Sequence, residues 1–506
     1  MKRSPAKFSY RPSAYRPASP TLRLLTLLTL GTGLCVSASS PPIPGNSVPT
    51  KALPAESVTL LPLPAPALSV RQIAGADAAL NRASRVRLGV LVTDADSGQT
   101  LYARQPDGLF TPASNMKLLS LGAALYGLGP DYWFSTSVTR PAGSTQAARA
   151  EHLTLVGSGD PSLDEVGGEH SLTGLARQVY ASGIRTVGGL RLDSRMIGSA
   201  PGQGQTGWRV PVVELPVSGL TLNDPRFGDG AELTTTPDIR AALQKTGRRF
   251  RTELERAGVR VGAGLEVVQG ATSEQERGVP EEGVATTRSA PLASLVQAAL
   301  KRSDNVWTEQ LYARLGIDSA TPVWRPASLD HAREQELVLL ARAGASGSGL
   351  VLADGSGLSG RDRLTPRTLT RLLRYLYLHP LTGPALTGSA PTGPALTGPT
   401  AAGSLTPQDL FFQRRNLLIE ALPRAGTGTA TRAAARLGGT LATRLGGLDV
   451  RAKTGTLPGV SALSGYLTTA GGRVLIFSVL MDGYGGPGQD LRRIQDALLR
   501  ALAADT

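Results

Sequence analysis

The sequence predicts an α+β fold, in which an antiparallel sheet is flanked by helices and a further domain is inserted into the chain. Three observations lead to this prediction: a pair of strand patterns within 86–102, two more between 460 and 481, and an amphipathic helix over 490–503. We expect the first and last strands to lie in one sheet, with helices on both of its faces. Residues 146–285 are expected to form the inserted domain.

Strand and helix patterns alternate along the chain. The first strand, 86–92, is followed by the turn Asp96-Ser97-Gly98 and a second strand, while 460–467 and 474–481 form a later pair. The repeated Leu-Thr-Gly-Pro pattern within 381–404 indicates a low-complexity surface loop. The other elements are expected as a helix at 114–128, strands at 152–156 and 190–193, and helices at 172–179, 237–258 and 292–315.

Length and composition are those of an ordinary globular protein. The chain has 506 residues, which is room for about three domains. A content of 41% hydrophobic and 18% charged residues excludes a chain that is disordered throughout. The formal net charge is +14, but residues 1–40 contain six basic residues and no acidic one, so the remainder carries +8.

The N-terminus is organised like an export signal. Its first residues are basic and lack acids, and the apolar run 24–36 is shorter than the ~20 residues that a membrane-spanning helix needs. Val36-Ser37-Ala38 offers small residues to a signal peptidase. We therefore expect residues 1–38 to be a cleaved signal peptide, followed by a Pro-rich extended linker at 39–80. An uncleaved anchor and a lipoprotein modified at Cys35 are the alternatives.

Lysine is rare in this chain, so its few positions are informative. Of the 53 basic residues only seven are lysine, and a lysine differs from an arginine chiefly in that its amine can lose a proton. Lys117 follows Ser114 by three residues, so a helix that begins near Ser114 places the amine beside the hydroxyl. A neutral amine there can accept the serine proton, whereas the alternative for Ser114 is a helix N-cap. Lys51 and Lys301 are attributed to chance.

Two further motifs favour the catalytic interpretation. Ser303-Asp304-Asn305 stands at the head of a helical pattern, and Lys453-Thr454-Gly455 precedes the strand at 460–467. Alone, the first could be a helix cap and the second a turn, but S-x-x-K, S-D-N and K-T-G in this order form a constellation for serine acyl transfer. Lys245-Thr246-Gly247 repeats the third motif in a basic helical stretch that no strand follows, so we interpret it as structural.

With these motifs the sequence resembles the class C low-molecular-mass penicillin-binding proteins, the D-Ala-D-Ala carboxypeptidase/endopeptidase family. The resemblance covers most of residues 80–506 and includes longer strings at 159–163, 220–223, 354–359 and 453–457. It implies a serine β-lactamase/transpeptidase-like catalytic domain built from 81–145 and 286–506. It also implies a serine-type D-Ala-D-Ala carboxypeptidase that acts on peptidoglycan stem peptides, is inhibited covalently by β-lactams, and needs no metal or organic cofactor.

The resemblance assigns the catalytic steps to four residues. Ser114 attacks the carbonyl of the penultimate D-Ala, and Lys117 accepts the serine proton. Burial and the positive charge of a neighbouring Lys453 are both expected to lower the pKa of Lys117, because each disfavours its ammonium form. Ser303 relays the proton to the departing amine, and Asn305 hydrogen-bonds Lys117 or the substrate amide.

Substrate binding is assigned to four more positions in the same way. Lys453 supplies positive charge for the terminal carboxylate, and the hydroxyls of Thr454 and Thr456 are further donors to it. The backbone N–H groups of Ser114 and Thr456 are expected to form the oxyanion hole. Asp160 matches the family's Asp-Pro string near the diamino-acid side chain of the substrate, and a turn built by Gly-Asp-Pro is the alternative.

Competing functions fit less of the sequence. A compact β-lactamase would lack the long spacing between Ser114 and Ser303, and a non-catalytic wall-binding protein would not need the intact motifs. The four histidines lack zinc-type spacing, and the only cysteine, Cys35, lies in the expected signal. The charge of +8 favours loose association with anionic wall polymers or a membrane surface. A nucleic acid is not expected as a partner, because no aromatic-basic motif is present and the protein is expected to be exported to the periplasm or cell envelope.

Overall fold

The computed structural model describes nine ranges of the chain. They are 66–82, 86–143, 147–197, 209–210, 215–223, 239–268, 280–317, 327–382 and 405–504. The expected signal peptide, most of the expected linker and nearly all of the repeat loop at 381–404 lie outside these residues. Among the helices of the described ranges, none is both long enough and apolar enough to cross a membrane.

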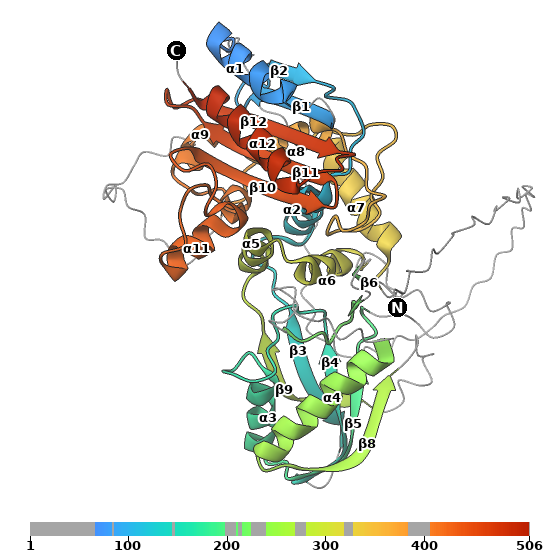
Figure 1. Cartoon of the computed structure of the whole chain (residues 1–506). Helices are drawn as coiled ribbons and strands as arrows, with labels where there is room; N and C mark the ends of the chain where they lie inside the picture. The colour runs from blue at the N-terminus through green and yellow to red at the C-terminus, as the bar shows by residue number, and fades with distance from the viewer. Residues whose placement is uncertain are drawn as a thin grey trace, which may run out of the picture. The chain divides into compact units, whose positions relative to one another are not determined.

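A five-stranded sheet forms the centre of the main domain, in the order β10-β11-β12-β1-β2 (Figure 1). Every neighbouring pair is antiparallel, and β1 pairs with β12 so that Leu88 lies opposite Met481 and Val92 opposite Phe477. This pairing confirms that the first and last strands share one sheet. The strands are β1 (Arg87–Asp94), β2 (Thr100–Arg104), β10 (Asp449–Leu457), β11 (Val460–Thr468) and β12 (Val474–Asp482).

Helices cover both faces of this sheet, as predicted. Every residue of β12 is buried, and because successive side chains of a strand point to opposite faces, they divide between two cores. Ile476 belongs to the core that includes helix α8 (Pro366–Leu378). Phe477 belongs to the core that includes α1 (Val70–Asn81) and α12 (Gly488–Ala503).

Helix α1 occupies the end of the segment expected to be a linker, so the linker prediction is wrong for residues 70–80. Ser69 begins the helix with a capping box, in which its side chain and that of Gln72 each accept a hydrogen bond from the other's backbone N–H. The amide of Gln72 also donates to the carbonyl of Leu502 at 2.9 Å. Ala76 and Leu80 are buried, so an apolar helical face outweighs the Pro-rich composition that precedes it.

A second five-stranded sheet has the order β8-β5-β4-β3-β9. Its strands are β3 (Ser135–Pro141), β4 (Arg149–Gly157), β5 (Thr186–Asp193), β8 (Arg260–Val268) and β9 (Glu281–Arg288). Strands β4, β5 and β8 are parallel, while β3 pairs antiparallel with both β4 and β9. Because β3 and β9 are paired neighbours, we propose that the inserted domain spans 135–288, where the sequence suggested 146–285.

The single helix expected at 292–315 is two helices, α5 (Leu292–Arg302) and α6 (Asn305–Leu315). Ser303 ends α5 in the left-handed conformation, with φ 58°. Asp304 then caps α6 by accepting a hydrogen bond from the N–H of Trp307 at 3.0 Å. The break therefore places Ser303 at the end of α5 and Asn305 at the start of α6.

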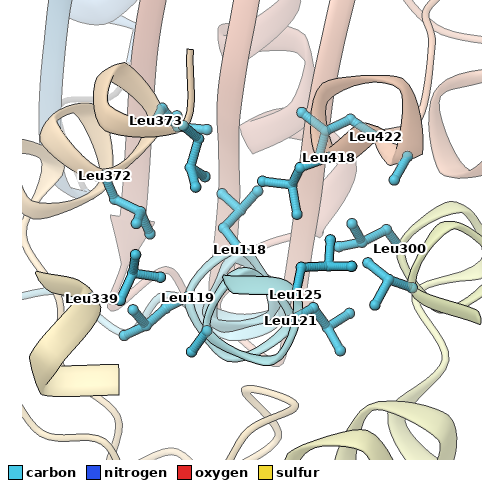
Figure 2. Packing of buried hydrophobic residues seen from close by; sticks show 14 of the residues in the cluster. Leu118, Leu119, Leu121, Leu125, Leu300, Leu339, Leu372, Leu373, Leu418 and Leu422 are labelled. Atoms are coloured by element: carbon cyan, nitrogen blue, oxygen red, sulfur yellow. The ribbon is translucent and has the colours of Figure 1, made fainter. Parts of the chain in front are cut away.

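Helix α2 (Met116–Leu128) is buried in the larger core. All of its residues from 116 to 125 are buried, and leucines of α2, α5, α7, α8 and the α10 region point toward one another around it (Figure 2). Each fully buried leucine contributes about 1.5–3 kcal/mol, so this helix is firmly held. The remaining helices are α3 (Leu172–Ala181), α4 (Ile239–Arg256), α7 (Leu329–Arg342), α9 (Pro407–Phe412), α10 (Leu417–Ala421) and α11 (Arg432–Gly438).

Candidate active site

Ser114 lies in the turn that leads into α2. A short 3₁₀ helix, η1 (Ala113–Asn115), continues directly into α2. Ala113 has a φ of 46°, in the left-handed region that costs energy for a residue with a β-carbon. Gly357 packs against this turn so closely that a β-carbon on it would lie 1.9 Å from the carbonyl oxygen of Ala113. The strained turn is therefore supported by the loop 354–359.

The amine of Lys117 is the centre of the site. Its Nζ lies 3.0 Å from Ser114 Oγ, 2.6 Å from Asn305 Oδ1 and 2.6 Å from the carbonyl oxygen of Ser356. The first contact joins the two ends of the S-x-x-K motif, and the second joins this motif to S-D-N. The third comes from a backbone carbonyl in the loop 354–359, to which the sequence had assigned no role.

Burial lowers the pKa of Lys117 to about 8, and Lys117 is completely buried. Nearby carboxylates oppose this effect by favouring the ammonium form; they are Asp354, Glu309, Asp304 and Asp362. The charge of Lys453 was expected to contribute to the lowered pKa of Lys117. In the structure the effect of one lysine on the other is seen at Lys453. Burial lowers the pKa of Lys453 far below its usual range, and the charge of Lys117 lowers it further.

Lys453 projects from β10, an edge strand of the main sheet. Its buried Nζ donates to Ser303 Oγ at 2.8 Å and to the carbonyl oxygen of Thr454 at 2.8 Å. The K-T-G and S-D-N motifs are thus in direct contact. Ser303 faces one lysine and Asn305 faces the other, while Asp304 between them caps α6. The helix-cap interpretation of this motif applies to Asp304, whose neighbours remain available for chemistry.

Asn115 is a structural link that sequence analysis missed. Its buried side-chain amide donates to the carbonyl oxygen of Lys453 at 3.1 Å, which ties the Ser114 turn to β10. Gly455 permits this approach, because a β-carbon there would lie 2.8 Å from the carbonyl oxygen of Pro112 and 3.0 Å from Asn115 Nδ2. The position of Asn115 inside the S-x-x-K motif was the available signal.

Thr454 and Thr456 share one face of β10, because they are two residues apart in a strand. Thr456 is exposed and Thr454 is half-buried. The Thr454 hydroxyl donates to Thr440 Oγ1 at 2.7 Å, and Thr440 belongs to the short helix η4 (Gly439–Leu441). Thr440 therefore adds a hydroxyl next to that of Thr454.

Lys301 has a structural role, so attributing it to chance was wrong. Its buried amine donates to the carbonyl oxygens of Leu422 and Leu437, the second at 2.9 Å. Burial lowers the pKa of Lys301 to about 7. Because Leu437 lies just before η4 and Lys301 lies two residues before Ser303, this contact joins the segment that carries Thr440 to the end of α5.

The second K-T-G string lies in helix α4 and not on a strand. Thr246 Oγ1 donates to the carbonyl oxygen of Leu220 at 3.1 Å. A β-carbon on Gly247 would lie 2.6 Å from the side chain of Leu265, so the glycine serves close packing of the helix on its sheet. These contacts give Lys245-Thr246-Gly247 a structural explanation.

Asp160 is buried in the inserted domain, with 1% of its surface exposed. Its Oδ1 accepts hydrogen bonds from the N–H and the hydroxyl of Ser162, and its Oδ2 lies 3.0 Å from His170 Nε2. Burial alone would lower the pKa of His170, but the hydrogen bond and charge of Asp160, with the charge of Asp164, raise it. These contacts are those of a carboxylate that stabilises a turn.

The described residues show no metal centre. Within these ranges, three or more His, Cys, Asp or Glu side chains do not gather as metal ligands. The polar side chains that hydrogen bonds bring together at the site described above are two amines, two hydroxyls and an amide, namely Lys117, Lys453, Ser114, Ser303 and Asn305.

This geometry agrees with what the chain is similar to. The sequence profile of the D-Ala-D-Ala carboxypeptidase 3 (S13) family matches residues 71–210, 228–392 and 408–505. The chain belongs to this family. It is a serine-type D-Ala-D-Ala carboxypeptidase/endopeptidase of the penicillin-binding proteins and acts on peptidoglycan. The predicted family, fold and enzyme class are confirmed.

Individual relatives are distant but cover most of the chain. A D-alanyl-D-alanine carboxypeptidase from an Actinomadura species is 28% identical over 82% of this chain and 81% of its own length. Carboxypeptidase DacB from Mycolicibacterium smegmatis is 29% identical over 81% of this chain and 79% of its own. The crystal structure of penicillin binding protein 4 (dacB) from Haemophilus influenzae shares the fold, with a TM-score of 0.63 at 18% identity, covering 85% of this chain and 99% of that one.

Proposed function

We propose that Ser114 forms the acyl-enzyme and that Lys117, in its neutral form, is the general base. The contacts of Lys117 Nζ support this proposal most directly. A neutral amine has two N–H bonds and one lone pair, whereas the Asn305 Oδ1 and Ser356 carbonyl oxygens can only accept. These two acceptors take both N–H bonds, so the lone pair is directed at the proton of the Ser114 hydroxyl, 3.0 Å away.

We also propose how the second lysine acts. Lys453 provides the positive charge that binds the terminal carboxylate of the stem peptide. Burial and Lys117 lower its pKa in the free protein, and an arriving carboxylate favours the charged form again. Ser303 Oγ lies 2.8 Å from Lys453 Nζ, and we propose that this hydroxyl carries the proton from Lys117 toward the departing D-Ala amine.

An oxyanion hole formed by the N–H groups of Ser114 and Thr456 is supported by the pattern of β10. The N–H of Ala452 donates to the carbonyl oxygen of Pro423, away from β11. Because N–H directions alternate along a strand, Thr454 and Thr456 present their N–H groups to the same outer edge. The Ser114 turn packs on this strand through Asn115. Loss of one such donor costs roughly 10²–10³ in rate in another serine enzyme.

The same nucleophile is expected to react with β-lactams, which mimic the D-Ala-D-Ala end and therefore become covalent inhibitors. Penicillin binding protein 4 from Haemophilus influenzae, which has this fold, has been crystallised in complex with a β-lactam. Residues 1–38 are proposed to export the protein to the periplasm or cell envelope, where its peptidoglycan substrate lies.

Product analysis tests the proposed function directly. Purified protein is incubated with monomeric and cross-linked muropeptides, and the products are identified by mass. We expect loss of one D-Ala from monomers and cleavage of the cross-link in dimers, and we expect Ser114→Ala to reduce both to background because it removes the nucleophile. Thermal unfolding of the variant verifies its fold. Undiminished hydrolysis by folded Ser114→Ala would refute the assignment of the nucleophile.

The contacts of Asp160 allow a test of its role. Asparagine keeps an oxygen for the Ser162 N–H but removes the charge beside His170. Because Asp160 is buried and paired, we expect Asp160→Asn to change two rates to the same extent: hydrolysis of stem peptides with a free diamino-acid amine, and acylation by penicillin. A selective loss of the first rate would instead assign Asp160 to substrate binding.

A further inference from the structure

Glu309 lies behind the catalytic lysine and was not singled out by any sequence motif. It is on α6, one turn after Asn305, and its side chain is completely buried. A single oxygen, Oε1, accepts hydrogen bonds from the N–H of Gly355 at 3.1 Å and from the N–H of Ser356 at 2.7 Å. The carbonyl of that same Ser356 accepts from Lys117 Nζ at 2.6 Å. Glu309 is therefore one residue removed from the proposed general base.

The loop 354–359, which lies between Glu309 and Lys117, is also held by contacts other than those with Glu309. The hydroxyl of Ser120 on α2 donates to the carbonyl of Gly355 at 2.7 Å. A β-carbon on Gly355 would lie 2.5 Å from the ring of Tyr312. The two N–H groups that face α6 are buried, and a buried N–H group without an acceptor is destabilising. A carboxylate at 309 thus fixes the peptide whose carbonyl orients Lys117.

We propose that Glu309 is a positioning residue for Lys117, which holds the Ser356 carbonyl in place and supplies a negative charge that stabilises the ammonium form. This inference rests on the proposed role of Lys117 as the base. The charged and titratable groups around Lys117 come from α6 and its cap, the loop 354–362, and β10. They are Asp304, Glu309, Asp354, Asp362 and Lys453. The carboxylates, Glu309 among them, raise the pKa of Lys117 against the effect of burial.

The chain offers a matched control on the neighbouring helix. Glu336 on α7 is also completely buried, and its Oε2 accepts a hydrogen bond from the Tyr312 hydroxyl at 2.6 Å. Burial raises its pKa well above the usual range, because the uncharged carboxyl group is favoured in a buried site. Glu336 is not among the carboxylates that raise the pKa of Lys117, so Glu336→Gln replaces a buried carboxyl group of the same size without changing those charges.

The test is the pH dependence of acylation by a penicillin, measured for the wild type, Glu309→Gln, Glu309→Ala and Glu336→Gln. Glutamine keeps the oxygen that accepts both N–H groups but loses the charge. The acylation rate is expected to rise with pH and then reach a plateau. We expect Glu309→Gln to reach the wild-type plateau at high pH, and to shift the rising part of the profile, the rising limb, toward lower pH by about one unit. Its acylation at pH 6 is then roughly tenfold faster than that of the wild type. Glu309→Ala is expected to lower the plateau, because the two N–H groups lose their acceptor. Glu336→Gln is expected to leave the limb in place.

The outcomes separate this inference from the proposed function. A rising limb in the wild type that Glu309→Gln does not shift, or that Glu336→Gln shifts equally, would overturn the role of Glu309 alone. A wild type with no rising limb would contradict the role of Lys117 as the base. If Glu309→Ala does not fold, as judged by thermal unfolding, the comparison of the two glutamine variants still decides.

Discussion

Replacing Lys117 with arginine is expected to slow the acylation of Ser114 by a penicillin by about 10²–10⁴-fold. The guanidinium keeps the positive charge but stays protonated at any accessible pH, so it cannot accept the serine proton. Lys117 also has no space to spare, because it is completely buried between Asn305 and the loop 354–359. The measurement is the rate of covalent labelling with a fluorescent penicillin, with thermal unfolding to verify the fold.

The other lysines provide chemically identical controls. Lys453→Arg retains a charge for the substrate carboxylate and is expected to keep measurable activity, although the buried site will accommodate a guanidinium poorly. Lys245→Arg, in the second K-T-G string on α4, is expected to acylate like the wild type. Near-normal labelling of Lys117→Arg, or a severe defect in Lys245→Arg, would contradict the roles assigned to these lysines.

The parts of the site that could be predicted depend on side chains that are close together in the sequence or belong to short motifs. Ser114 and Lys117 are three residues apart, so helical geometry alone brings them together. The order of the three motifs then indicated that Ser303, Asn305 and Lys453 would join them, and the hydrogen bonds of both lysines bring these residues together. The main sheet was predictable for a similar reason, because its strands at both ends of the chain are short, apolar and bounded by turns.

The parts that escaped prediction depend on long-range contacts and on the backbone. The carbonyl of Ser356 contacts Lys117 across 239 residues of sequence, and any residue type has such a carbonyl. Glu309 accepts hydrogen bonds from backbone N–H groups in the same loop. Because nearly every residue has such a group, this contact leaves no motif in the sequence. Lys301 was attributed to chance, because nothing in the local sequence shows that its amine donates to two distant backbone carbonyls.

Boundaries were missed for a related reason. Composition favoured a linker up to residue 80, but α1 packs on α12, more than 400 residues away in the chain. Strand β3 precedes the expected start of the inserted domain, and its partner β9 follows nearly 150 residues later. Local patterns show that an element exists, whereas its partner is decided by tertiary packing.

The pH dependence of acylation in the unmodified protein tests the central claim, that a neutral Lys117 activates Ser114. Burial lowers the pKa of Lys117 to about 8. Below that pH the neutral fraction falls tenfold per unit, so the second-order rate constant for a penicillin should rise about 50-fold between pH 6 and pH 8. Lys117 and Lys453 interact, so the observed midpoint belongs to the pair.

The measurement needs only the wild-type protein, a penicillin and a series of buffers at constant ionic strength, with the adduct quantified by intact mass. We expect a rising limb of unit slope that levels off near pH 8, as the ammonium of Lys117 loses its proton. A rate that is constant or falls between pH 6 and pH 8 would contradict a titrating lysine base at Ser114.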